Sequence, residues 1–79
     1  MRRSRVKITL DILDLLATED RRKTELVYQS NSCFSQMNIH IERLVEAGLI
    51  AFNTRTEKWY LTLAGKEAAG HLRAVEALL

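Results

Sequence analysis

The sequence predicts a mainly helical α+β domain with a small β-hairpin, in the order α-α-α-β-β-α. Three observations predict it. Apolar residues recur at helical spacing in several stretches, two short strand-like runs lie between residues 49 and 62, and the chain has no proline and only three glycines. At 79 residues we expect a single domain near the lower size limit for one core, so stabilisation by dimerisation is also expected.

The composition excludes several classes of protein. The single cysteine allows no internal disulfide and provides no zinc ligand set, so no metal is expected. No apolar run approaches the ~18 residues of a membrane span, and the basic N-terminus leads into an amphipathic segment rather than a signal sequence. The chain also lacks a phosphate-binding glycine loop and a nucleophile–base pair. We therefore expect a cytoplasmic protein that is not an enzyme and has no cofactor or evident small-molecule ligand.

Residues 5–17 (RVKITLDILDLLA) form the first predicted helix. Its apolar residues make two adjoining stripes, Val6, Thr9, Leu13 and Leu16, and Ile8, Ile12 and Leu15, with Leu10 lying further round. This surface is wider than one packing partner requires. Either the helix is central in a three-helix core or part of it meets a second subunit. Asp11 and Asp14 share the polar side, but no cleft pattern supports acid–base chemistry there.

Residues 23–47 predict two helices joined by a tight turn. Thr24 is expected to cap a short helix, which the polar run 29–32 ends because such side chains compete for backbone hydrogen bonds. The longer helix, 34–47, ends at Gly48, and Phe34 is expected to pack into the core. Its buried face is expected to follow the apolar residues at i, i+4, i+7 and i+8, which are Met37, Ile41, Leu44 and Val45. This arrangement is a helix-turn-helix.

The start of the longer helix carries the only cysteine. Ser32 or Cys33 lies near the N-cap, where the helix dipole favours a thiolate. Cys33 is therefore either a redox-responsive group or simply a small, partly buried residue.

Residues 49–62 predict a hairpin, with strands at 49–53 and 58–62 around a polar loop. Trp59, Leu61 and Leu63 are expected to face the core, with Lys58 and Tyr60 outward. A hairpin directly after a helix-turn-helix is a wing, and residues 21–23 are expected to add a very short strand. The alternative is a surface hairpin without a binding role.

Residues 63–79 form the last predicted helix, with Thr62 as its N-cap and Gly70 as a site of close backbone approach. Its apolar face is Ala64, Ala68, Leu72, Val75 and Leu79, widened by Ala69 and Leu78. The helix either folds back onto its own core or forms a dimer interface. The expected interface residues are Leu72, Val75, Leu78 and Leu79.

The charge pattern and the outward face of helix 34–47 point to nucleic acid. The net charge is only +2, but basic residues cluster at the N-terminus, where residues 1–4 are expected to be a flexible arm, and again at 21–23. The expected phosphate-contacting residues are Arg2, Arg3, Arg5, Arg21, Arg22, Lys23, Thr24, Arg55 and Lys58. The expected base-reading residues are Ser35, Gln36, Asn38, Ile39, His40 and Arg43. The alternative is that these are merely solvated faces.

The stretches RRSRVKITLDIL, RRKTELVYQSN, LVEAGLI and WYLTLAGKEA cover much of the chain and resemble the archaeal winged helix-turn-helix regulators. That family includes the small dimeric crenarchaeal chromatin proteins. The most specific parts are Arg-Lys-Thr before the second helix and the ending Tyr60, Leu61, Thr62, Gly65 and Lys66. The resemblance implies sequence-specific or architectural binding of double-stranded DNA by a homodimer, with the C-terminal helix as the dimer element.

Departures from the family pattern favour a regulator. Family members often carry lysines where this chain has Ser35 and Ile39, Cys33 replaces or displaces the usual serine cap, and the final helix is shorter than that of the chromatin-type members. We therefore expect a nucleoid-associated transcriptional regulator acting through the recognition helix 34–47 and the wing 49–62. The alternatives are an architectural chromatin protein and a protein–protein interaction module, in which the exposed Ile39 and the first helix would meet a partner.

Overall fold

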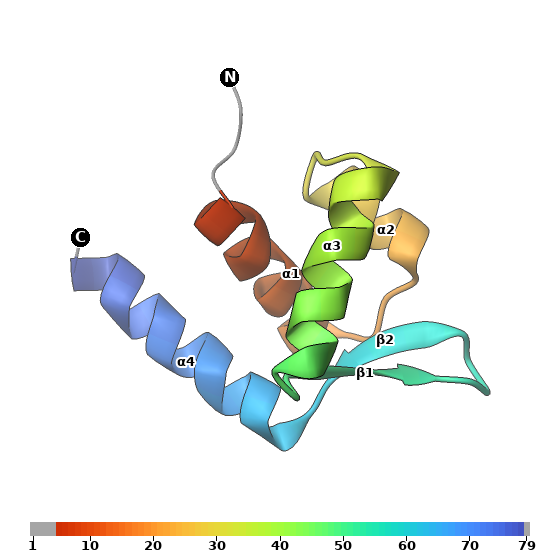
Figure 1. Cartoon of the computed structure of the whole chain (residues 1–79). Helices are drawn as coiled ribbons and strands as arrows, with labels where there is room; N and C mark the ends of the chain where they lie inside the picture. Colours follow the sequence, from red (N-terminus) through yellow and green to blue (C-terminus); the bar gives the residue numbers. More distant parts are fainter. Residues whose placement is uncertain (1–4, 79) are drawn as a thin grey trace.

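The computed structural model of the chain describes residues 5–78, which follow the predicted order α-α-α-β-β-α (Figure 1). The predicted fold class is therefore confirmed. Arg2, Arg3 and the rest of the expected arm 1–4, like Leu79, lie outside the described residues. The elements are α1 (Arg5–Thr18), α2 (Lys23–Gln29), α3 (Phe34–Glu46), β1 (Ile50–Asn53), β2 (Lys58–Leu61) and α4 (Leu63–Leu78).

Helix α1 is the centre of the core. Ile12 and Leu13 are completely buried, and the helix packs against both α4 and β2. This confirms the central position that the wide apolar surface predicts. Two details differ, because Val6 is exposed in the first turn whereas Leu10 is buried.

Helix α2 begins two residues earlier than a Thr24 cap would require. Arg22 is the N-cap, and its backbone N–H donates to Oε1 of Glu25 at 3.2 Å. Thr24 therefore lies within the first turn, and its expected capping role is wrong. The polar run ends the helix as predicted. The Ser30 hydroxyl donates to the Leu26 carbonyl at 2.6 Å, and Asn31 adopts φ 56°, a left-handed conformation that asparagine tolerates.

Helix α3 starts after Cys33, whose extended backbone makes it the N-cap, and ends before Gly48 at φ 75°. The residues that face the core are Met37, His40, Ile41 and Leu44. These fall at i, i+3, i+4 and i+7, so the buried face is turned toward His40 and away from Val45. Val45 and Phe34 consequently lie at the edge of the buried face and are both exposed, contrary to expectation.

Strands β1 and β2 form the expected antiparallel hairpin, with Ile50 opposite Leu61 and Asn53 opposite Lys58. Within the wing, Ile50 and Leu61 are buried and belong to the core. Leu63 was expected to face the core, but it is exposed as the first residue of α4. The expected strand at 21–23 is reduced to a bridge between Arg21 and Trp59. Lys23 already belongs to α2.

Thr62 links the start of α4 to the end of α3. Its hydroxyl accepts the Gly65 N–H at 3.0 Å, which confirms the predicted N-cap, and donates to the Gly48 carbonyl at 2.6 Å. The close backbone approach occurs at Gly65 rather than at Gly70. A Cβ on Gly65 would overlap the carbonyl of Leu49, whereas nothing lies within 4 Å of a Cβ on Gly70.

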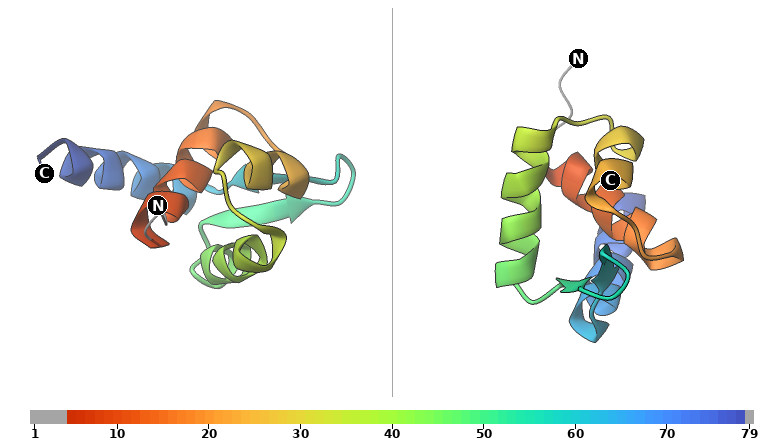
Figure 2. Two further views of the ribbon diagram at one scale, coloured as in Figure 1. Left: turned by 90° about the horizontal axis from the view of Figure 1, so that it is seen from above. Right: turned by 90° about the vertical axis from the view of Figure 1, so that its right-hand side faces the viewer.

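Helix α4 packs against α1 as far as Leu72 and Arg73, and its C-terminal end extends beyond the rest of the domain (Figures 1 and 2). Ala69 is buried and Leu72 packs on the core, while Ala64 is exposed. Nε of Arg73 lies 2.8 Å from Oδ1 of Asp14, which ties the two helices together. Across residues 5–78 no helix has the length and apolar character that crossing a membrane requires.

Candidate nucleic-acid interface

The outer face of α3 is free of other elements, because the helix lies along one side of the domain (Figure 2, right). Five of the six expected base-reading residues are exposed there, namely Ser35, Gln36, Asn38, Ile39 and Arg43. Ile39, an apolar side chain, is 49% exposed on this face. The structure therefore brings these five side chains to one surface.

The sixth residue, His40, does not lie on this surface. It is only 7% exposed and belongs to the core-facing side of α3, so the expected outward position is wrong. The physical reason is its spacing, since it follows Met37 by three residues and precedes Leu44 by four. Burial lowers the pKa of His40, with smaller contributions from the positive charges of Arg43 and Arg5.

Because the charge of Arg5 contributes to the lowered pKa of His40, the start of α1 lies near this histidine. The positive charges of Arg5 and Arg43 both act on the His40 imidazole, so both lie near it, and both side chains are exposed. Arg5 is the first residue of α1 and Arg43 lies in the last turn of α3. Two cations from distant parts of the sequence thus lie near His40.

The other expected cations lie at the start of α2 and on the wing. Arg22 and Thr24 are exposed, Lys23 is half-buried, and all three surround the N-terminus of α2, where the helix dipole also attracts an anion. Arg55 is exposed in the turn of the wing, and Lys58 is half-buried at the start of β2.

Arg21, by contrast, has a structural role. Its side chain is only 13% exposed, and its guanidinium donates to the Leu15 carbonyl at 3.2 Å, to Oε1 of Gln29 at 2.8 Å and to the Thr18 hydroxyl at 3.0 Å. Glu19 lies 3.3 Å away as an ion-pair partner. With its donors directed into these contacts, Arg21 does not stand free for phosphate as expected. It joins the end of α1 to α2 instead.

The turn of the wing is held by Asn53. Its side-chain oxygen accepts the backbone N–H of Arg55 at 2.9 Å and that of Thr56 at 3.4 Å. Phe52 and Trp59 pack across the two strands with their ring centroids 5.0 Å apart. These contacts give the wing a defined shape, so that Arg55 projects from an ordered turn.

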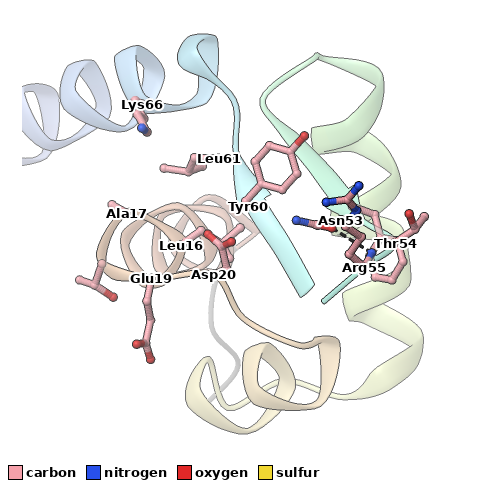
Figure 3. A pocket seen from close by; sticks show the side chains of 12 residues that line it. Leu16, Ala17, Glu19, Asp20, Asn53, Thr54, Arg55, Tyr60, Leu61 and Lys66 are labelled. Carbon is pink, nitrogen blue, oxygen red and sulfur yellow. Dashed lines mark hydrogen bonds between the residues drawn. The ribbon is translucent and has the colours of Figure 1, made fainter. Parts of the chain in front are cut away.

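An open depression of about 700 Å³ lies between the wing, the end of α1 and the start of α4 (Figure 3). Charged side chains of both signs line it: Glu19, Asp20, Arg55 and Lys66. No residue of α3 contributes to it, so the depression is distinct from the outer face of the recognition helix. Within the described part of the chain, no three His, Cys, Asp or Glu side chains gather closely enough to hold a metal ion.

Cys33 is exposed at the N-terminus of α3, as its N-cap position requires. Its Sγ lies 3.3 Å from the Ser35 hydroxyl, and this contact is the main cause of a lowered pKa of the thiol, with backbone hydrogen bonds contributing further. The thiol makes no side-chain capping hydrogen bond.

The expected dimer residues fall into two groups. Leu72 packs against the core of its own chain. Val75 and Leu78 are 55% and 87% exposed on the part of α4 that extends beyond the domain (Figure 2). Leu79 lies outside the described residues.

Two further residues of the outer face, Glu42 and Glu46, were not among the predicted contacts. Both are exposed and lie seven and eleven residues after Ser35, on the side of α3 opposite the core. The helical spacing alone could have identified them. They were not predicted because mainly cationic and amide side chains were expected to contact nucleic acid.

Comparison with known proteins relates the chain to a family and to solved structures. A family model described as winged helix-turn-helix matches residues 2–79. The fold is similar to that of Sso10a-2, a DNA-binding protein from Sulfolobus solfataricus, with a TM-score of 0.82 and 19% sequence identity over 96% of this chain and 81% of that chain. The comparison with curated proteins gives no match.

Proposed function

The chain belongs to the winged helix-turn-helix family, and on that basis we propose that it binds double-stranded DNA as a homodimer and regulates transcription. The observation that carries the proposal is the exposed outer face of α3, which holds hydrogen-bonding side chains, and exposed cations also lie on α1, at the start of α2 and on the wing. The similarity in fold to a DNA-binding protein from Sulfolobus supports the same partner. We also propose that the protein is archaeal, nucleoid-associated and without enzymatic activity.

In this proposal α3 enters the major groove. Asn38 and Gln36 have amides that can pair bidentately with adenine, and the Arg43 guanidinium can pair with guanine. Ser35 can donate or accept, and the exposed Ile39 can contact a thymine methyl group. His40 supports this surface from beneath and does not touch a base.

Phosphate contacts would come from elements other than α3. Arg5 lies near His40 of α3 and is exposed. We expect further contacts from Arg22, Lys23 and Thr24 at the start of α2 and from Arg55 and Lys58 on the wing, which would present cations and a hydroxyl to the backbone. Arg2 and Arg3 would add contacts from the N-terminal segment. Such contacts fix the register of the protein on the duplex without reading its sequence.

Dimerisation would use the end of α4. Val75 and Leu78 leave apolar surface on a helix that extends beyond its own domain, and burying such side chains is favourable by about 1.5–3 kcal/mol each. A two-fold pair of domains would place two α3 helices on successive half-sites of an operator.

A regulator fits better than an architectural chromatin protein because of the charge on α3. The helix has one arginine against two glutamates, so it gains little from the nonspecific attraction to phosphate on which an architectural protein depends. An architectural role is the second candidate, and the cations on α1, α2 and the wing favour it.

The proposal is tested by selecting bound duplexes from a random pool and then measuring Arg43→Ala and Lys23→Ala. Arg43→Ala is expected to weaken binding to the selected site more than binding to random DNA, whereas Lys23→Ala is expected to weaken both alike. Equal weakening by Arg43→Ala on both DNAs would remove Arg43 from base reading. A pool without enrichment would favour the architectural role.

A further inference from the structure

The outermost line of α3 carries no cation. Ser35, Ile39, Glu42 and Glu46 follow one another at i, i+4, i+7 and i+11, opposite the buried Met37, Ile41 and Leu44. Arg43 lies to one side of this line. If α3 enters the major groove, the side chains on this line point most directly at the bases.

The two glutamates on the line do not stabilise the helix. Glu42 and Glu46 are separated by four residues, a spacing at which like charges repel, and Glu46 lies at the negative end of the helix dipole. Among residues 5–78 neither carboxylate has a hydrogen-bond or ion-pair partner. A pair of acids that opposes the local rules of helix stability is the pattern expected at a functional surface.

A carboxylate at this position interacts differently with the bases and with the phosphates of a duplex. It accepts hydrogen bonds but donates none, and it is repelled by phosphate. In the major groove the amino group at N4 of cytosine is the donor that pairs with glutamate. Adenine also has an amino group there, but its neighbouring N7 is an acceptor that faces the same groove.

We propose that Glu42 selects a cytosine in the DNA site by accepting a hydrogen bond from the N4 amino group, and that its charge weakens binding to DNA without that base. The proposal rests on the proposed function, because it requires α3 to lie in the major groove. Glu42 is then a specificity-determining residue that contacts a base, while the cations beside α3 supply the affinity. Discrimination by a repulsive group is one of the two general routes to specificity.

The test compares the wild type with Glu42→Ala, using Glu67→Gln as the matched control. Glu42 is exposed, and alanine is the best helix former, so the variant is expected to fold. Glu67 is an exposed acid on α4 whose replacement changes the net charge equally but lies outside α3. Duplexes are selected from a random pool with the wild type, and each base pair of the selected site is then replaced in turn.

The wild-type site is expected to contain one C·G pair per half-site whose replacement weakens binding about tenfold or more, as is usual for a single mismatch. In Glu42→Ala that penalty is expected to disappear at this pair only, and binding to random DNA to tighten. Glu67→Gln is expected to keep the full penalty. The inference alone is overturned if Glu42→Ala keeps it or if the site has no such pair. If the wild type binds no duplex, the proposed function fails as well.

Discussion

The backbones of Arg21 and Trp59 exchange two hydrogen bonds, at 3.1 Å from Arg21 N to Trp59 O and at 2.7 Å in the reverse direction. This pair attaches the wing to the segment between α1 and α2. The Arg21 side chain reaches from the same point to Leu15 on α1 and to Gln29 on α2. One residue therefore connects the wing and the first two helices.

Arg21→Ala is expected to destabilise the fold by about 1–3 kcal/mol, because it removes hydrogen bonds from a charged and largely buried group. Urea unfolding at one fixed protein concentration measures the change. Arg22→Ala is the matched control, since this neighbouring side chain is exposed and its removal should cost within about 0.5 kcal/mol. Equal destabilisation by the two variants would contradict the structural role of Arg21.

The two glycines of α4 are expected to respond to alanine in opposite directions. Gly65→Ala forces a Cβ against the Leu49 carbonyl and should destabilise by about 1–3 kcal/mol or more, the cost of overpacking. Gly70→Ala meets nothing and should stabilise the helix by about 0.5–1 kcal/mol. Thermal unfolding of the two variants measures this directly, and a stable Gly65→Ala protein would show that α4 does not approach Leu49 so closely.

Stability is expected to fall as the pH drops below about 6.5. His40 has a pKa below the ordinary value of 6.5 in the folded chain, so the unfolded chain binds the proton more readily in this window and gains population as pH falls. Urea midpoints at pH 7.5 and 5.5 measure the effect. The difference should shrink in His40→Gln and persist in His71→Gln, whose histidine is exposed. An unchanged difference in His40→Gln would assign the pH dependence to other groups.

Replacing Val75 and Leu78 together by serine is expected to convert a dimer into a monomer that remains folded. Sedimentation equilibrium should give about twice the chain mass of 9.1 kDa for the wild type and the single chain mass for the variant. Leu63→Ser is the control, because Leu63 is equally apolar and exposed but lies at the other end of α4. A variant that stays dimeric would place the interface elsewhere.

The order of the elements and several of their ends could be predicted because each element carries its own local signal, whereas the start of α2 at Lys23 was not. Thr62 caps α4, Gly48 ends α3, and the polar run after Gln29 ends α2. Apolar periodicity fixed the type of the helices. Periodicity predicted the buried face of α3 less accurately. His40 has the spacing of a buried residue but was assigned to the polar face, and Val45 was assigned to the buried face because it is apolar. Burial follows position in the packed helix, so His40 is inside and Val45 outside.

The candidate site was harder to predict because its residues are brought together by contacts between distant segments. A cluster of three basic residues in sequence does not reveal that Arg21 is engaged by Thr18 and Gln29. Likewise, the approach of Leu49 to Gly65 depends on how α4 returns toward the wing. Such long-range contacts distinguish the structural cation from its exposed neighbours, and no local pattern contains them.

The central claim, duplex DNA binding through α3 and the wing, is tested most directly by titrating the full chain against random and selected duplexes at two salt concentrations. We expect affinity for both to fall steeply as salt rises, with the selected duplex bound more tightly at each concentration. Arg22→Ala should reduce the slope of log affinity against log salt by about one, because one cation no longer neutralises a phosphate. No binding to any duplex at low salt, or binding indifferent to salt, would contradict the account.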